Sequence, residues 1–301
     1  MLRLLPSCLI VLCLAVPLTG VAREFPMPLP GNDVVGEISS ITSRYEDTLS
    51  DIARANDLGF LEISEANPGV DPWLPGEGLE IILPTRFLLP PVPRKGIVIN
   101  LAELRLYYYP KGENRVITYP LGIGREGWGT PTGETRVTGK RPNPTWTPPE
   151  SIRLEHLEMG DPLPKIVPPG PDNPLGEYAI YLAMSGYLLH GTNKPFGVGM
   201  RVSHGCIRLY PEDIKKLFPR IPVGTRVRII NEPYKLGWIG ERLYIEAHQP
   251  LSEQRQNAVV DIAQLQGAVS AAVGSRRPTI DWDSLMDAAL TPSGIPIPVT
   301  P

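Results

Sequence analysis

Three residues in one segment of the chain could carry out nucleophilic chemistry together. The segment reads HGTNKPFGVGMRVSHGCIRL and spans residues 190–209, so that Cys206 lies sixteen residues after His190 and two after His204. A thiol attacks as the thiolate and therefore needs a base or a positive neighbour, which either imidazole could supply. Arg208 could hold a substrate carboxylate through two hydrogen bonds. These residue types predict acyl transfer through a cysteine.

Glycines and backbone amides in the segment fit the same chemistry. Gly191 and Gly205 allow the backbone to turn tightly, and consecutive amides at Gly205 and Cys206 could form an oxyanion hole. Two other interpretations stay open. Each histidine could be purely structural, or His190, His204 and Cys206 could be zinc ligands. Because no fourth cysteine or histidine lies nearby, we predict a site without a metal ion or other cofactor.

The N-terminus decides how many cysteines the mature protein keeps. An apolar run from Leu4 to Leu18 follows a positive residue and precedes small residues that end at Ala22, so residues 1–22 are predicted to be a secretory signal peptide. An uncleaved membrane anchor is the alternative. Cleavage after Ala22 would remove both other cysteines and leave Cys206 unpaired in a compartment that favours disulfides. Such a thiol is reactive, paired with another molecule, or buried as a small apolar side chain.

Composition sets broad limits on the protein. Its 301 residues allow two domains, and a net charge of −3 with dispersed Lys and Arg gives no sign of a nucleic-acid partner. The 36 prolines favour strands and ordered loops over long helices. No segment after the signal peptide is long and apolar enough to predict a transmembrane helix.

Residues 37–84 predict a small unit with a strand at each end and two helices between them. The strands are expected at 37–41 and 79–84 and the helices at 48–53 and 57–66. With YEDTLSDIARAN, EANPGV and GLEIILP, the unit resembles a LysM module, a family that binds the glycan of peptidoglycan. Glu46 stands where many LysM modules have glycine, and a structural adaptor without glycan affinity is the alternative.

A second domain is expected after a stiff, Pro-rich linker at residues 85–95. We expect this domain, residues 96–231, to be able to fold by itself. Its predicted strands are 97–100, 104–109, 116–121, 135–138, 178–183, 187–189 and 226–230, and its predicted helices are 151–159 and 211–218. The long loop 142–176 is of a length that is often functional.

Residues 232–301 are expected to form a C-terminal extension. It has a predicted strand at 242–247 and a helix whose apolar stripe is Ala258, Ile262, Leu265 and Val269. The Pro-rich end from Thr291 is expected to be a mobile tail.

The segment around Cys206 resembles the motif of bacterial L,D-transpeptidases, in which a histidine precedes Ser-His-Gly-Cys by some fifteen residues and Arg or Asn follows. GIVINLAELRLYYYP, TPTGETRVTGKRPNPTWTP and DNPLGEYAIYLA also resemble that family. The resemblance implies a mainly β catalytic domain, with barrel-like or sandwich-like sheets and short helices. It makes Cys206 the nucleophile and His190 the base, with the base oriented by a backbone carbonyl, that of Gly191.

The same resemblance assigns the neighbouring residues. His204, Gly205 and Cys206 would line the oxyanion hole, while Arg208 and Ser203 would hold substrate or structure. The donor would be a peptidoglycan tetrapeptide stem, cleaved between meso-diaminopimelate and the terminal D-Ala. The protein is most similar to the periplasmic branch of the family, whose partners are stem peptides and glycan. The acyl acceptor would be a lysine of an outer-membrane lipoprotein or a second diaminopimelate.

Two alternatives to transfer remain at this point. With the same residues and water as acceptor, the protein would be an L,D-carboxypeptidase or a hydrolase that releases the lipoprotein. If the thiol is inert, it would be a structural protein that binds peptidoglycan. The presence of His190, His204, Cys206 and Arg208 together favours the enzyme.

Overall fold

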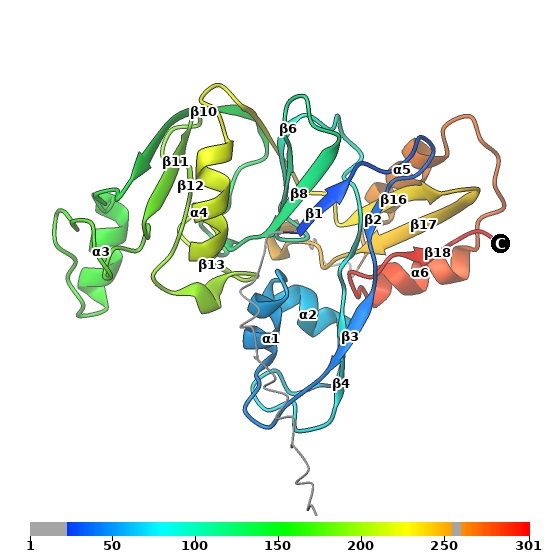
Figure 1. The fold of residues 1–301 in the computed structure, drawn as a ribbon, viewed down its shortest axis with the longest axis horizontal. Coiled ribbons are helices and arrows are strands. Elements are labelled where there is room, and N and C mark those ends of the chain that lie inside the picture. Colours follow the sequence, from blue (N-terminus) through cyan, green and yellow to red (C-terminus); the bar gives the residue numbers. More distant parts are fainter. Residues whose placement is uncertain (1–22, 255–259) are drawn as a thin grey trace, which may run out of the picture.

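The computed structural model describes residues 23–254 and 260–301, and the predicted signal peptide and Ala258 lie outside these ranges. The fold is mainly β, as predicted, and centres on a curled nine-stranded sheet (Figure 1). In sheet order the strands are β1 (Arg23–Pro26), β8 (Arg115–Pro120), β7 (Arg105–Tyr109), β6 (Gly96–Asn100), β15 (Arg226–Ile230), β10 (Gly133–Pro142), β11 (Tyr178–Leu182), β12 (Leu188–His190) and β14 (Ile207–Arg208). In the described part of the chain, no helix has the length and apolar character needed to cross a membrane.

One face of this sheet packs on α4 (Pro211–Arg220). The helix begins with Pro211 in its first turn, followed by Glu212 and Asp213, as its sequence predicts. Its apolar residues Ile214 and Leu217 are fully buried. These two side chains pack into a hydrophobic core on this face of the sheet. Every second residue of the strands points into that core, including Ile97, Ile99, Leu106, Ile180, Leu189, Ile207, Val227 and Ile229.

Residues 37–84 have the expected order of two strands flanking two helices. The elements are β3 (Ser39–Thr42), α1 (Leu49–Ala55), α2 (Phe60–Ala66) and β4 (Glu80–Leu83), and β3 pairs with β4. Thr48 caps α1, because its Oγ1 accepts a hydrogen bond from the Asp51 amide at 3.1 Å. The secondary structure of this unit agrees with the predicted resemblance to a LysM module. The resemblance itself remains a prediction.

The structure of residues 85–95 differs from the stiff linker predicted there. β5 (Arg86–Leu88) pairs with β2 (Val34–Gly36), and the side chains of Phe87, Leu88 and Leu89 are buried. The prolines of this region flank β5. Because they lie outside the strand, their missing N–H groups do not interrupt its hydrogen bonds with β2. Residues 85–90 are therefore a part of the core, whereas residues 91–95 are exposed or half-buried.

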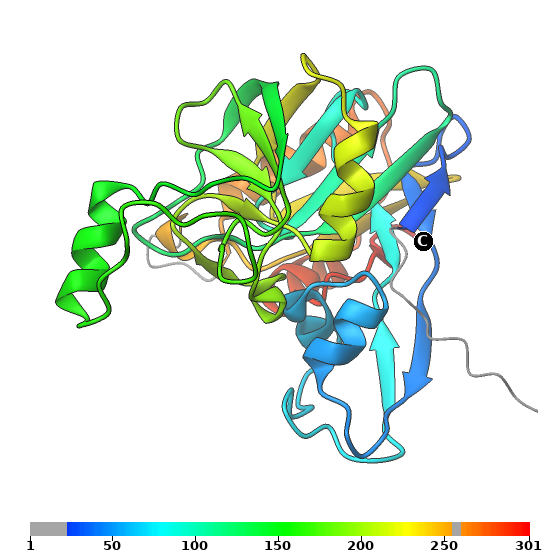
Figure 2. The same ribbon diagram turned by 60° about the vertical axis from the view of Figure 1, so that its left-hand side comes forward.

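The LysM-like unit is in direct contact with the second predicted domain (Figure 2). The Leu61 amide at the start of α2 donates to the Gly199 carbonyl oxygen at 3.1 Å. A Cβ on Gly199, whose φ is +81°, would lie 2.0 Å from the Phe60 nitrogen, so that only glycine permits this approach. Residue 199 lies between His190 and Cys206 in sequence. The unit thus supports the loop that connects the two candidate catalytic residues.

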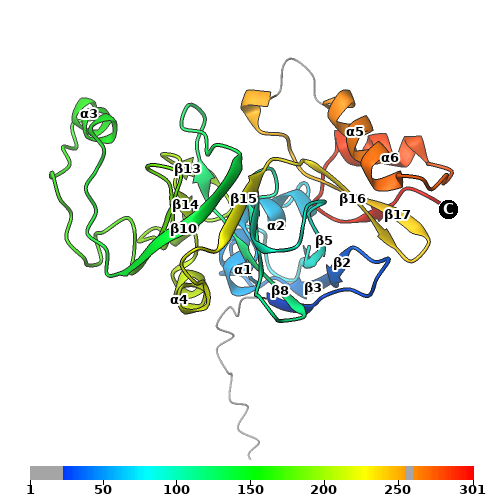
Figure 3. The same ribbon diagram turned by 90° about the horizontal axis from the view of Figure 1, so that it is seen from above.

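The C-terminal residues form a separate three-stranded sheet with two helices at the opposite end from α3 (Glu150–Glu158) (Figure 3). Its elements are β16 (Tyr234–Ile239), β17 (Arg242–Ala247), β18 (Ile297–Pro298), α5 (Ile262–Val273) and α6 (Trp282–Leu290). Leu265 and Val269 are buried as predicted, whereas Ile262 is half exposed. The tail expected to be mobile instead pairs with β17 and buries Val299, because its apolar residues cover the sheet edge.

Candidate active site

Sheet register brings His190 and Cys206 to the same face of neighbouring strands. β12 and β14 are parallel, with Leu189 opposite Ile207 and His190 opposite Arg208. Side chains alternate between the two faces of a sheet, so Cys206, two residues before Arg208, faces the same side as His190. β11 continues this face, since Ala179 lies opposite His190. The fifteen residues between the histidine and the cysteine belong to the connection between these two strands.

His190 is almost completely buried and has a fixed orientation. Its Nδ1 lies 2.5 Å from the Gly191 carbonyl oxygen, which can only accept a hydrogen bond. The proton is therefore on Nδ1, and Nε2 carries the free electron pair. Burial, with a further contribution from the positive charge of Arg208, lowers the pKa of His190 to about 3. The ring is a neutral imidazole at neutral pH.

Cys206 is a free cysteine just before β14. Its Sγ–H donates to the Gly186 carbonyl oxygen at 3.7 Å. Burial raises the pKa of the thiol, while a backbone contact at Leu188 and the charge of Arg208 act in the opposite direction. The resting pair is thus a neutral thiol and a neutral imidazole, and not an ion pair.

The turn before Cys206 is held by hydrogen bonds to both sides. The Ser203 Oγ donates to the Cys206 carbonyl oxygen at 2.5 Å, and Thr130 Oγ1 donates to the Gly205 carbonyl oxygen at 2.8 Å. Gly205 has a φ of +99°, and a Cβ there would lie 3.1 Å from the Tyr187 ring. Ser203 and Gly205 therefore shape the turn, and the roles proposed for them in the site stay predictions.

The amides of this turn are available to a ligand. Within residues 23–254 and 260–301, the N–H groups of His204, Gly205 and Cys206 have no hydrogen-bond acceptor. Unpaired amides next to a nucleophile can stabilise an oxyanion. Arg208 has a similar property, because its Nε is buried and has no partner in the described residues. Unpaired donors on two sides of Cys206 suit a substrate with a carbonyl group and a carboxylate.

His204 faces away from this pair and contacts a group that the sequence did not indicate. Its Nε2 lies 2.7 Å from Glu155 Oε2 on α3 (Glu150–Glu158), and its ring packs edge-on against Trp128. Arg125 also pairs with Glu155. The sequence predicted the helix, but no periodicity singled out Glu155. These contacts attach the long loop of α3 to the Cys206 turn.

The zinc alternative receives no geometric support. His190, His204 and Cys206 are not among the His, Cys, Asp and Glu side chains whose ligand atoms lie within 4.8 Å of one another in the described residues. The group of potential ligands found in the described part of the chain is Glu103, Glu246 and His248. Lys235 already occupies that group, since its ammonium forms ion pairs with both carboxylates.

A family model and several known proteins that match this chain all belong to one family. The model of the YkuD L,D-transpeptidase catalytic domain matches residues 94–229. The probable L,D-transpeptidase YcfS of Escherichia coli K12 is 51% identical over 80% of this chain and 77% of its own length. YbiS of the same strain, also a probable L,D-transpeptidase, is 44% identical over 93% of this chain and 92% of its own length. The probable L,D-transpeptidase ErfK/SrfK of that strain is 45% identical over 79% and 77%.

Proposed function

Since the chain belongs to the L,D-transpeptidase family, we propose that Cys206 carries the acyl group of a peptidoglycan tetrapeptide stem and transfers it to an amine. The observation that supports this most is the register of β12 and β14, which places the oriented imidazole of His190 opposite Arg208, two residues from the Cys206 thiol. The donor bond is that between meso-diaminopimelate and the terminal D-Ala.

The first step transfers one proton and forms one bond. The Cys206 thiol gives its proton to Nε2 of His190 as Sγ attacks the carbonyl carbon, and the unpaired amides of residues 204–206 receive the developing oxyanion. The C–N bond then breaks, and the imidazolium returns the proton to the leaving amine of D-Ala. The result is a thioester at Cys206 and a free amino acid.

Arg208 links substrate binding to the basicity of His190. Its charge contributes to the low pKa of the imidazole. A donor carboxylate bound to Arg208 neutralises that charge, which raises the pKa of His190 and that of the Cys206 thiol together.

The second step regenerates the enzyme. An acceptor amine attacks the thioester carbon, the C–S bond breaks, and the thiolate receives the proton that the amine loses, through His190. We propose export to the periplasm through cleavage after Ala22, and attachment to the polymer through the LysM-like unit. The acceptor is a diaminopimelate amine or a lipoprotein lysine.

The test is product analysis. Purified protein is incubated with a soluble disaccharide tetrapeptide, with and without a lipoprotein C-terminal peptide, and the products are identified by mass spectrometry. Loss of D-Ala with a new amide supports transfer. Loss of D-Ala with a free tripeptide in every case supports the carboxypeptidase, and an unchanged substrate contradicts both.

A further inference from the structure

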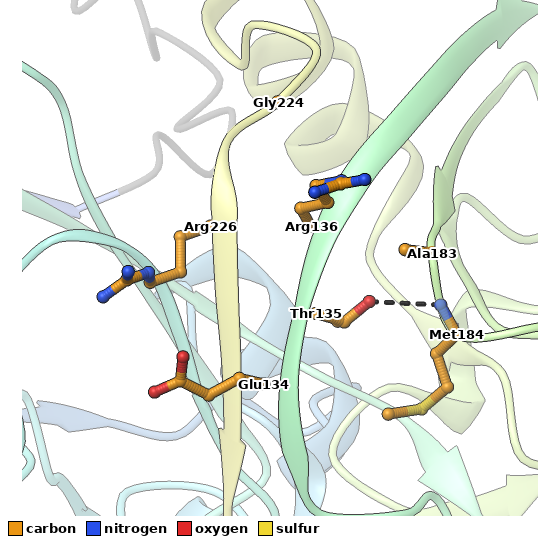
Figure 4. Close-up of a pocket in the computed structure, with 7 residues that line it drawn as sticks. All are labelled: Glu134, Thr135, Arg136, Ala183, Met184, Gly224 and Arg226. Atoms are coloured by element: carbon orange, nitrogen blue, oxygen red, sulfur yellow. Dashed lines mark hydrogen bonds between the residues drawn. The ribbon is translucent and has the colours of Figure 1, made fainter.

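A groove that carries two arginines and one glutamate runs along β10 and β15 (Figure 4). Its volume is about 540 Å³. The residues that line it are Glu134, Thr135, Arg136, Ala183, Met184, Gly224 and Arg226. A second depression of about 430 Å³ shares Glu134 and continues along the same two strands past Arg228.

The register of these strands places like charges directly opposite each other. Arg136 on β10 is the cross-strand neighbour of Arg226 on β15, and Glu134 is the neighbour of Arg228. Glu134 and Arg228 form an ion pair, with Nε 3.1 Å from Oε1. Across the described residues, neither Arg136 nor Arg226 forms an ion pair, and both are exposed. Three arginines and one glutamate thus occupy these two pairs of cross-strand positions, although the whole chain is net negative.

This arrangement does not help the fold. Like charges directly opposite each other in an antiparallel pair are destabilising. Sites where a sequence departs from the locally favourable choice are often sites of function. Two unpaired guanidinium groups across a groove suit an anion, and they bind carboxylates most strongly through paired hydrogen bonds.

The groove ends at the turn that contacts the nucleophile. Met184 lies at its edge, and Figure 4 shows the hydrogen bond of 3.1 Å from the Met184 amide to Thr135 Oγ1 on β10. The Tyr187 amide closes the turn on the Met184 carbonyl oxygen at 3.2 Å, and Gly186 accepts from the Cys206 thiol. Met184 is two residues from Gly186, so their Cα atoms are within about 7 Å.

We propose that this groove binds the second substrate, a peptide with free carboxylates whose amine attacks the thioester. The inference rests on the proposed function, because a second substrate exists only if Cys206 is acylated. Once the donor is bound covalently at Cys206 with its carboxylate at Arg208, another anionic peptide needs another cationic site within reach. The groove provides it on the other side of the Met184–Tyr187 turn.

The test separates the two half-reactions in the full chain. The double variant Arg136→Gln/Arg226→Gln is compared with Arg242→Gln/Arg277→Gln, which removes two exposed arginines from the C-terminal unit. The acceptor is the stem tripeptide L-Ala–γ-D-Glu–meso-diaminopimelate, used with free or with amidated carboxylates. Acyl-enzyme formation from the donor is followed by mass, and aminolysis by the yield of the new amide.

The groove variant is expected to acylate at the wild-type rate and to need about tenfold more free-carboxylate tripeptide for the same aminolysis, since exposed charge pairs are individually weak. The amidated tripeptide should be used equally by all proteins. The control should behave as wild type. Equal use of the free tripeptide by both double variants would overturn the proposal.

Two further measurements keep the groove testable if no acyl-enzyme forms. Binding of the free tripeptide to a Cys206→Ala protein should weaken about tenfold when Arg136→Gln and Arg226→Gln are added. The single variant Arg226→Glu places a carboxylate opposite Arg136, so it should raise the melting temperature and still weaken tripeptide binding. Unchanged tripeptide binding in both variants would contradict the proposal that the groove binds the acceptor, whether or not Cys206 forms an acyl-enzyme.

Discussion

Arg105 on β7 and Glu62 on α2 form a buried ion pair across 43 residues of sequence. Arg105 Nε lies 2.6 Å from Oε1 and Nη2 lies 2.8 Å from Oε2. Glu62 also accepts the Gly59 amide, and Arg105 donates to Thr118. A pair with these hydrogen bonds joins the LysM-like unit to the central sheet, so the two parts stabilise one structure.

Removing the carboxylate should destabilise the whole protein. Glu62→Ala leaves Arg105 charged and buried, which we expect to lower the free energy of unfolding by about 3–5 kcal/mol. Denaturant unfolding measures it, with Glu46→Ala at an exposed position as control. A loss no larger than that of the control would show that the pair does not join the two parts.

The catalytic domain should not fold alone, contrary to the expectation from its sequence. A chain that begins near Pro93 exposes the faces of Val98, Tyr107 and Val116 and leaves Arg105 unpaired. It should aggregate or show no cooperative transition, whereas the chain from residue 23 should unfold in one transition. A soluble fragment with a sharp transition and normal acylation would contradict this expectation.

The two histidines should differ in their effect on acylation. His190→Ala removes the base, which should reduce the rate by about 10²–10⁴-fold. His204→Ala removes the contact with Glu155 and should reduce the rate less, and Glu155→Gln should resemble it because it weakens the same attachment of α3. Single-turnover acylation by the donor is the measurement. If His204→Ala were the more severe change, the base would be His204.

The Cys206 thiol should lose its proton only at high pH. Because burial raises the pKa of Cys206 and the pKa of His190 is about 3, the free enzyme holds a neutral pair over a wide range. Alkylation by iodoacetamide should therefore still increase with pH at pH 9, the ordinary value for a thiol. A plateau reached at or below pH 7 would instead indicate a thiolate paired with an imidazolium.

Sequence reasoning could propose the candidate catalytic residues because they lie within one segment of seventeen residues, from His190 to Cys206. It also found α1, α2 and α4, whose apolar spacing and caps are local signals. It could not find Glu155, Arg125 or Trp128, because their contact with His204 depends on how the long loop folds back.

Two segments that the sequence analysis interpreted wrongly contain short strands with distant partners. β5 was interpreted as linker because its prolines are conspicuous, and its pairing with β2 across some fifty residues leaves no local mark. The end of the chain was interpreted as mobile for the same reason, although β18 pairs with β17 and Val299 is buried. Pairing of this kind follows from tertiary packing and not from local propensity.

The most direct test of the account is the mass of the protein after brief incubation with a tetrapeptide donor and no acceptor amine. We expect a covalent adduct equal to the donor less D-Ala, located by fragmentation on the peptide that contains Cys206 and released by hydroxylamine, as a thioester should be. The Cys206→Ala protein should give no adduct and keep a wild-type unfolding transition. An adduct on another residue, or turnover by Cys206→Ala, would contradict the mechanism.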